Sequence, residues 1–240
     1  STEKPLYIER YLEDKEWWDT VYTDRYQILE DNLNQNRRRI LDVGSGPGLF
    51  LQKGKERGWK VKGIEPSSIA AAFSKDILGL DISEEFLDEK LAMKMEKFDA
   101  VNLGEVLEHL PNPLGMLSLI NTLLEDEGLI CIIVPNDFNP FQLLLRNHIK
   151  VDPWWVQPPH HINYFDFDSL EALLTQAGFK VIYQESTFPI DMFLLMGENY
   201  IGDDELGRKC HEKRKIFDMN LSKDKALDRK IKKSFSEMGI

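Results

Sequence analysis

The sequence lacks any apolar run long enough to cross a membrane as a helix. Its longest apolar runs, residues 129–134 and 192–196, are far shorter than the roughly 20 residues that a bilayer requires. The first residues are polar and charged and do not resemble a signal peptide. Because the sequence begins with Ser1 rather than Met, we expect some N-terminal residues to be missing. We expect no association with a membrane.

Cysteine is also scarce. The chain has two cysteines, Cys131 and Cys210, which do not suggest a disulfide framework, and neither is paired with His or Cys at a spacing typical of metal ligands. Cys131 lies in an apolar stretch that predicts a buried strand, where a small packed side chain is favoured over a reactive thiol. We therefore expect a cytoplasmic protein without a metal site.

Positive charge is in short supply. The formal net charge is −11, which disfavours a protein that binds nucleic acid through its phosphates. Residues 208–233 are the exception, since eleven Lys or Arg and four Asp or Glu make a net +7 there, leaving −18 for the rest of the chain. This segment predicts a solvated amphipathic helix. The alternative is a docking surface for an acidic partner or for a second copy in a homo-oligomer.

Strands and helices alternate along most of the chain. A helical extension rich in aromatic residues is predicted over residues 6–33. The predicted strands cover residues 39–43, 60–65, 78–82, 98–103, 128–134 and 180–185, and the predicted helices cover 49–57, 67–75, 113–124 and 168–177. This alternation predicts an α/β fold with a doubly wound, mostly parallel sheet. Ligands of such sheets bind beyond the carboxyl ends of the strands.

Two stretches interrupt the alternation. Residues 135–165 form an insertion rich in proline and aromatic residues, and insertions of that length are usually functional. The stretch after residue 187 is helical and charged. The expected organisation is an N-terminal helical extension (1–36), a core with the insertion (37–187) and a C-terminal charged helical segment (188–240).

The most informative segment is residues 40–48, Ile-Leu-Asp-Val-Gly-Ser-Gly-Pro-Gly. An apolar strand leads into an acidic residue and then into three glycines at alternate positions, Gly44, Gly46 and Gly48. Glycine permits a sharp turn and lets a ligand approach the main chain, and the next helix presents free N–H groups to an anionic group. Such a cradle holds a dinucleotide or S-adenosylmethionine. The spacing differs from the G-x-G-x-x-G that a pyrophosphate requires.

The glycine loop resembles motif I of the class I S-adenosylmethionine-dependent methyltransferases, in which the pattern is apolar-Asp-Val-Gly-x-Gly-x-Gly. Residues 98–110, Phe-Asp-Ala-Val-Asn-Leu-Gly-Glu-Val-Leu-Glu-His-Leu, closely resemble the strand 4 block of the small-molecule methyltransferases of the ubiquinone-biosynthesis type. The resemblance covers about residues 39–185. It implies a Rossmann-like sheet of the seven-stranded type, S-adenosylmethionine as cofactor and a small-molecule acceptor.

The resemblance also implies a set of cofactor-binding residues. Glu65, after the second predicted strand, would accept both ribose hydroxyls, and Asp81 would accept from the exocyclic amine of the adenine. The alternative for Glu65 is a solvent-facing side chain at a strand end. The full set is Asp42, Gly44, Ser45, Gly46, Gly48, Glu65, Pro66, Asp81, Ile82, Leu103, Gly104 and Glu105.

Three histidines are the candidate catalytic residues. His109 ends the strand 4 block, and His160 and His161 lie in the insertion, in a stretch that resembles a recurrent Pro-x-His-x-x-x-Phe pattern of the family. Imidazole titrates near neutral pH and can take a proton from a hydroxyl nucleophile. For the pair His160 and His161, the alternative is that one of them caps the backbone or packs on Trp154 and Trp155. For His109, the resemblance also allows a structural or cofactor-side role. Methyl transfer also proceeds on enzymes that position the reactants without a base.

The acceptor is less well defined. Enzymes that methylate amino groups of DNA bases or glutamine usually carry an Asp/Asn-Pro-Pro-aromatic motif where this chain has Asn102-Leu103-Gly104-Glu105, so we expect an oxygen acceptor. The insertion aromatics favour a small, partly apolar or carbohydrate substrate, or they only close the cofactor pocket. They are Phe138, Phe141, Trp154, Trp155, Tyr164 and Phe165.

The chain departs from the family at its end. The family sheet closes with a hairpin, yet no clear seventh strand follows the strand predicted over residues 180–185, so we expect that strand to be missing and one sheet edge to be exposed. Two alternatives to a methyltransferase remain open. One is a dinucleotide-dependent oxidoreductase, and the other is a methyltransferase-like fold that binds a cofactor or a partner without catalysis.

Overall fold

The computed structural model describes residues 6–34 and 36–240 of the chain. The chain divides into two compact units. The first unit holds the described residues up to Leu107 together with Asn112–Val134, and the second holds Glu108–Pro111 together with Pro135–Ile240. The second unit thus contains both the 135–165 insertion and the stretch expected to be a C-terminal segment.

The first unit is built on a parallel sheet of five strands in the order β3-β2-β1-β4-β5. The strands are β1 (Arg39–Val43), β2 (Lys60–Ile64), β3 (Ile82–Ser83), β4 (Phe98–Gly104) and β5 (Leu124–Ile133). The strand predicted over residues 78–82 is therefore reduced to the two residues of β3. Since β1 pairs with β2 on one side and with β4 on the other, the order reverses at β1, which is the switch point where ligands of such sheets bind.

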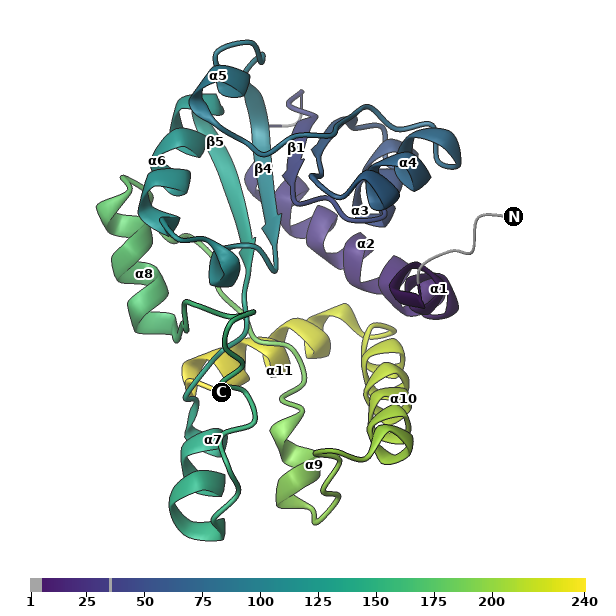
Figure 1. The fold of residues 1–240 in the computed structure, drawn as a ribbon, viewed down its shortest axis with the longest axis vertical. Coiled ribbons are helices and arrows are strands. Elements are labelled where there is room, and N and C mark those ends of the chain that lie inside the picture. Colours follow the sequence, from purple (N-terminus) through teal and green to yellow (C-terminus); the bar gives the residue numbers. More distant parts are fainter. Residues whose placement is uncertain (1–5, 35) are drawn as a thin grey trace. The chain divides into compact units, whose positions relative to one another are not determined.

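Helices cover the sheet of the first unit. They are α1 (Leu6–Glu13), α2 (Lys15–Asn32), α3 (Leu49–Glu56), α4 (Ser68–Asp76), α5 (Glu89–Ala92) and α6 (Pro113–Leu123). Figure 1 shows β4 and β5 side by side, with α6 on one side of them and α2 and α3 on the other. The core between α2 and α3 is aromatic, because the fully buried Tyr26 ring stacks on Phe50 with ring centroids 4.5 Å apart. The helical extension predicted over residues 6–33 is confirmed, with a break at Asp14.

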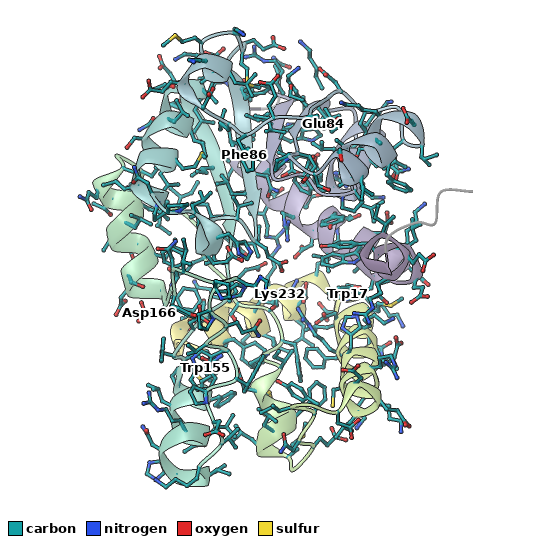
Figure 2. The ribbon with its side chains drawn as sticks, viewed as in Figure 1. Trp17, Glu84, Phe86, Trp155, Asp166 and Lys232 are labelled. Atoms are coloured by element: carbon teal, nitrogen blue, oxygen red, sulfur yellow. The ribbon has the colours of Figure 1, made fainter. Side chains whose placement is uncertain are left out.

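The second unit is largely helical. Its elements are α7 (Pro140–Leu144), the π-helix η2 (Leu145–Ile149), α8 (Phe167–Gln176), α9 (Asp191–Leu195), α10 (Asp204–Leu221) and α11 (Lys225–Glu237), and the short 3₁₀ helix η1 (Leu107–His109) runs across the boundary. Asp166, labelled in Figure 2, begins α8 by accepting a hydrogen bond from the Ser169 backbone, and the Ser169 side chain accepts from the Asp166 backbone. This capping box explains why the predicted helix starts where it does.

The strand predicted over residues 180–185 is wrong. Residues 179–189 form no regular structure, and Ile182 is 58% exposed. An alternation of apolar residues forms a strand only where a neighbouring strand pairs with its backbone groups. In the described part of the chain, the sheet ends at β5.

β5 is consequently an edge strand. Within the described sheet it pairs only with β4, and its residues 129–133 are half-buried. The sequence predicts a fully buried strand over 128–134, because β-branched and apolar residues dominate there. That expectation is wrong for Cys131, which is half-buried, because no further strand covers the second side of β5 among the described residues.

The basic segment 208–233 forms most of α10 and α11. Many of its cations are paired with acids one turn away on the same helix, as in the exposed pairs Lys209–Glu205 (2.6 Å) and Lys233–Glu237 (3.8 Å). Such pairs are typical of a solvated helix face, which is the first of the two interpretations of this segment. In the described residues, no helix is both long and apolar enough to cross a membrane.

Candidate functional site

The glycine loop follows β1 at the switch point of the first unit. Gly44, Gly46 and Gly48 all have a positive φ, at 74°, 52° and 79°. The loop is held to the end of β2, because the N–H groups of Gly44 and Ser45 both donate to the carbonyl oxygen of Ile64, at 2.8 and 3.1 Å. Gly48 then begins α3 without a capping side chain, so the free N–H groups of the first helical turn face the loop.

The three glycines differ in what surrounds them. A Cβ atom on Gly44 would lie 2.7 Å from Val106 Cγ2, and one on Gly48 would lie 2.7 Å from Leu80 Cδ1, so a side chain at either position would force its neighbours to shift. A Cβ atom on Gly46 would meet nothing within 4 Å. The space that a side chain at Gly46 would occupy is therefore open, whereas the Gly46 N–H donates to Glu65 and its carbonyl oxygen accepts from Ser74 Oγ. The glycine spacing predicts a cofactor cradle at this loop, and that role stays a prediction.

Glu65 joins the glycine loop to the start of α4. One carboxylate oxygen accepts a hydrogen bond from Gly46 N and the other accepts one from Ser67 N, both at 2.7 Å. The residue is only 8% exposed, so the alternative of a solvent-facing glutamate is wrong. Each carboxylate oxygen has a second lone pair, so both remain able to accept a hydroxyl group.

A buried carboxyl–amide pair underlies the loop. Asp42 on β1 lies opposite Asn102 on β4, and Asn102 Nδ2 donates to Asp42 Oδ1 at 2.6 Å. Burial raises the pKa of Asp42 to about 7, while the bond from Asn102 and the charge of Arg25 oppose the rise. Asn102 Oδ1 and the nearby Ser45 Oγ are buried without a hydrogen-bond partner among the described residues. Unsatisfied polar atoms at a strand end are typical of a ligand site.

Arg25 is a candidate that sequence reasoning missed. Its guanidinium lies over the rings of Tyr22 and Phe50, with Cζ 5.4 and 5.6 Å from their centroids. A Cβ atom on Gly104, at the carboxyl end of β4, would lie 3.7 Å from Arg25 Nη1. A cation held in this way can bind a carboxylate. The only signal in the sequence is an arginine within the aromatic-rich extension, which by itself does not indicate a site.

The remaining expected cofactor residues are dispersed. Leu103 is fully buried in β4, and Glu105 follows with a positive φ of 58° and donates its N–H to Ile133 O at 2.8 Å. Ile82 is buried in β3, whereas Pro66 is exposed. Asp81 precedes β3, and its largely exposed carboxylate pairs with Lys62 Nζ at 2.9 Å. The adenine-binding role of Asp81 stays a prediction, since no contact brings it to the glycine loop.

The candidate catalytic histidines lie together in the second unit. The backbone carbonyl of His160 lies 2.6 Å from His109 Nδ1, and the His109 and His161 rings meet edge to face with centroids 5.0 Å apart. His109 Nε2 is 3.9 Å from Oε1 of the buried Glu108. The N–H groups of Ile162 and Asn163 donate to Glu108 O, which fixes the segment after the histidine pair. His160 therefore takes part through its backbone.

Glu108 joins the histidines, although it is not among the expected site residues. One ligand-type atom from each of Glu108, His109 and His161 lies within 4.8 Å of the others. Imidazole nitrogens and a carboxylate can hold a divalent cation or can move a proton. The signal for Glu108 is its place directly before His109 in the strand 4 block.

Comparison with protein families identifies the chain. Residues 15–184 match the family model described as a methyltransferase domain. The chain belongs to this family. Since the match covers both the glycine loop and the strand 4 block, the resemblance to class I S-adenosylmethionine-dependent methyltransferases is confirmed, and the oxidoreductase alternative is contradicted.

Two curated proteins that are similar to this chain carry the same name. This chain is 31% identical over 136 residues to the ubiquinone biosynthesis O-methyltransferase of Histophilus somni (strain 2336). The match covers 48% of this chain and 57% of the relative. This chain is also 31% identical over 150 residues to the protein of the same name from Ruegeria sp. (strain TM1040), covering 60% and 61%. The chain thus spans about three fifths of the length of these two relatives.

A solved structure supports the fold. The crystal structure of a SAM dependent methyltransferase from Archaeoglobus fulgidus is 19% identical, with a TM-score of 0.51, and the match covers 75% of this chain and 80% of the other. The parallel sheet with its flanking helices is therefore the Rossmann-like methyltransferase fold that the motifs predict. It has five strands in the described residues.

Proposed function

We propose that this methyltransferase uses S-adenosylmethionine to methylate an oxygen atom of a small-molecule acceptor. The observation that carries the proposal is the open space in front of Gly46, beside the buried Glu65 carboxylate that accepts from the Gly46 N–H, in a chain of the methyltransferase family. The relatives named above are O-methyltransferases, which supports oxygen as the acceptor atom.

The residues of the first unit fit the cofactor. The loop from Gly44 to Gly48 would lie against its adenosine part, and Glu65 would accept from its ribose hydroxyls. Arg25 would hold its carboxylate, because its guanidinium lies beside Gly104 at the carboxyl end of β4. When bound, the cofactor supplies an electrophilic methyl group on a sulfonium. The protein then contributes orientation of the reactants, which is the larger part of catalysis in such reactions.

The proton of an acceptor hydroxyl would go to His109. If Nδ1 carries the hydrogen, it donates to His160 O, and Nε2 is left with the lone pair that accepts a proton. The carboxylate of Glu108 lies 3.9 Å from that nitrogen and would stabilise the imidazolium once it forms. His161 packs edge-on against the ring and restricts its rotation.

The test is calorimetric titration of the chain with S-adenosylhomocysteine, with NAD(H) in parallel, followed by turnover with candidate acceptors. Micromolar binding of S-adenosylhomocysteine and no binding of NAD(H) are expected. Binding of NAD(H) alone would overturn the proposal. Binding of S-adenosylhomocysteine without turnover of any acceptor would instead favour the non-catalytic alternative.

A further inference from the structure

Several buried polar atoms of the second unit lack hydrogen bonds. Each belongs to a side chain of the insertion or of the stretch that contains α9. The atoms are Asn136 Oδ1, Asp137 Oδ2, Trp154 Nε1, Trp155 Nε1, Asp191 Oδ1 and Tyr200 Oη, and none bonds to a described residue. Folded proteins leave few buried polar atoms unsatisfied, so a group of them in one place indicates a role other than packing. We call these six residues the polar–aromatic cluster.

The members of the polar–aromatic cluster are neighbours. Asn139 Nδ2 donates both to Asn136 O, at 3.0 Å, and to Asp191 Oδ2, at 3.2 Å. The Asp191 carboxyl in turn lies close enough to Asp137 and to Tyr200 for its charge to raise the pKa of both side chains, after the larger effect of burial.

Trp154 and Trp155 contact the rest of the polar–aromatic cluster through aromatic rings. The Trp154 ring meets Tyr200 edge to face, with centroids 5.7 Å apart. Trp155, labelled in Figure 2, meets Phe138 in the same way at 5.8 Å. Two stretches of the insertion and one around α9 therefore converge on the polar–aromatic cluster.

The unfilled atoms of these side chains are unfavourable to bury, although the other carboxyl oxygen of Asp191 accepts from Asn139. Asp137 and Asp191 are 2% and 3% exposed, and Trp155 is 4% exposed. Burial raises the pKa of Asp137 to about 6, which shows how poorly its charge is solvated. Two carboxyl groups, an amide, two indoles and a phenol with unfilled hydrogen bonds are a poor choice for a core but a suitable one for a polar ligand.

The donor and acceptor types restrict that ligand. Carboxylate and amide oxygens accept hydrogen bonds, so a cation or an amine would satisfy Asp137 and Asp191. An indole N–H only donates, and neither a cation nor an ammonium group can accept from Trp154 and Trp155. Hydroxyl groups do both. Aromatic rings beside such groups also offer faces for the apolar side of a ring-shaped ligand.

We propose that the polar–aromatic cluster binds the acceptor of the methyl transfer, and that this acceptor is a polyhydroxylated ring of the carbohydrate class. Asp137 and Asp191 accept from ring hydroxyls, the indoles of Trp154 and Trp155 donate to hydroxyl oxygens, and Tyr200 does either. This inference rests on the proposed function, since it names the substrate class of the proposed enzyme.

The binding test uses saturation-transfer NMR on the full chain with methyl β-D-glucopyranoside, methyl β-D-galactopyranoside and methyl α-L-rhamnopyranoside at millimolar concentration. Catechol serves as a phenolic competitor class. We expect transfer to the ring protons of at least one glycoside, and a drop of tenfold or more in its affinity on Tyr200→Phe, Trp154→Phe or Asp191→Asn. The matched control is Asp152→Asn, an exposed aspartate of the same unit, which should bind like the parent chain.

A stability measurement separates binding from structure. Tyr200→Phe removes a hydroxyl that makes no hydrogen bond, so its melting temperature should be unchanged or higher while glycoside binding is lost. A melting temperature several degrees lower would assign the hydroxyl a structural role and overturn the inference for Tyr200.

The remaining outcomes of the NMR experiment and of the titration test the substrate class and the proposed function separately. Transfer to catechol alone, or to no glycoside, would overturn the carbohydrate assignment, and the proposed function would stand as long as S-adenosylhomocysteine still binds in the parallel titration. Failure of that titration would instead count against the proposed function. The two failures are therefore distinguishable.

Discussion

The carboxylate of Glu65 accepts a hydrogen bond from the backbone N–H of Gly46 at 2.7 Å, although the two residues are 19 positions apart in the chain. The same carboxylate accepts from Ser67 N through its other oxygen. A single buried side chain thus holds the glycine loop and the start of α4 in place. Glu65 therefore has a structural role in the loop, and the proposed contact with a ribose would use the remaining lone pairs of the same carboxylate.

Glu65→Ala should therefore weaken binding of S-adenosylhomocysteine by about 10- to 100-fold, which corresponds to about 1–3 kcal/mol for a lost charged acceptor. Glu65→Gln keeps one acceptor oxygen, so its affinity for S-adenosylhomocysteine should lie between that of the parent chain and that of Glu65→Ala. Calorimetric titration measures the effect. Glu85→Ala, an exposed glutamate of the same unit, is the control and should bind like the parent chain. Unchanged affinity in Glu65→Ala would remove this residue from the site.

Gly46→Val should abolish binding of S-adenosylhomocysteine, because the new side chain would fill the space in front of the loop. Its matched control is Gly58→Val. Gly58 also has a positive φ, of 84°, and a Cβ atom there also meets nothing within 4 Å, but it lies outside the loop. Both variants carry the same kind of backbone strain, of about 1–2 kcal/mol, so their melting temperatures should fall together. If Gly46→Val still binds as well as Gly58→Val, the loop is not the cofactor site.

Asp42 should make stability depend on pH. Its pKa is raised from 3.8 to about 7, first by burial, so the folded chain keeps a proton that the unfolded chain loses above pH 4. Unfolding then releases a proton, and the free energy of unfolding falls as the pH rises from about 4 to about 7. At about 1.4 kcal/mol per pKa unit, the loss is on the order of a few kcal/mol.

Urea denaturation at pH 5 and at pH 8 measures this effect. Asp42→Asn should lose the part of the pH dependence that Asp42 contributes, while Asp137 and Asp191, whose pKa values are also raised, retain theirs. A parent chain that is equally stable at both pH values, or a variant with the same slope, would contradict the assignment.

The three histidines should differ in their effect on turnover. His109→Ala should lower the rate by about 10²–10⁴-fold, the usual contribution of a general base, and His161→Ala should lower it less. His160→Ala keeps the carbonyl that accepts from His109 and should retain nearly full activity. Single-turnover rates with saturating cofactor measure all three, and affinity for S-adenosylhomocysteine should be unchanged in each.

Chelation tests the same group of residues in another way. As a proton acceptor, the Glu108–His109–His161 group needs no cation, so dialysis against EDTA should leave turnover unchanged. Loss of activity on chelation, restored by a divalent cation, would assign the group to a metal and would contradict the proposed base.

Patterns of residues close together in the sequence predicted much of the secondary structure of the first unit. β1 begins and ends where its apolar run predicts, and the alternate glycines place the loop and the start of α3 correctly, because turns and capping depend on residues close together in the chain. The strand predicted over residues 180–185 failed for the opposite reason. A strand depends on a partner far away in the sequence, and apolar alternation alone does not supply one.

The sequence by itself determined the family, the order of strands and helices from β1 to β3, and the glycine turn at Gly44–Gly48, because each depends on short-range patterns of residues. Only the tertiary structure decided that Glu65 bonds to Gly46, that Glu108 joins His109 and His161, and that buried polar groups from three stretches meet around Asp191. Such meetings depend on how the chain folds back on itself, which no local spacing records.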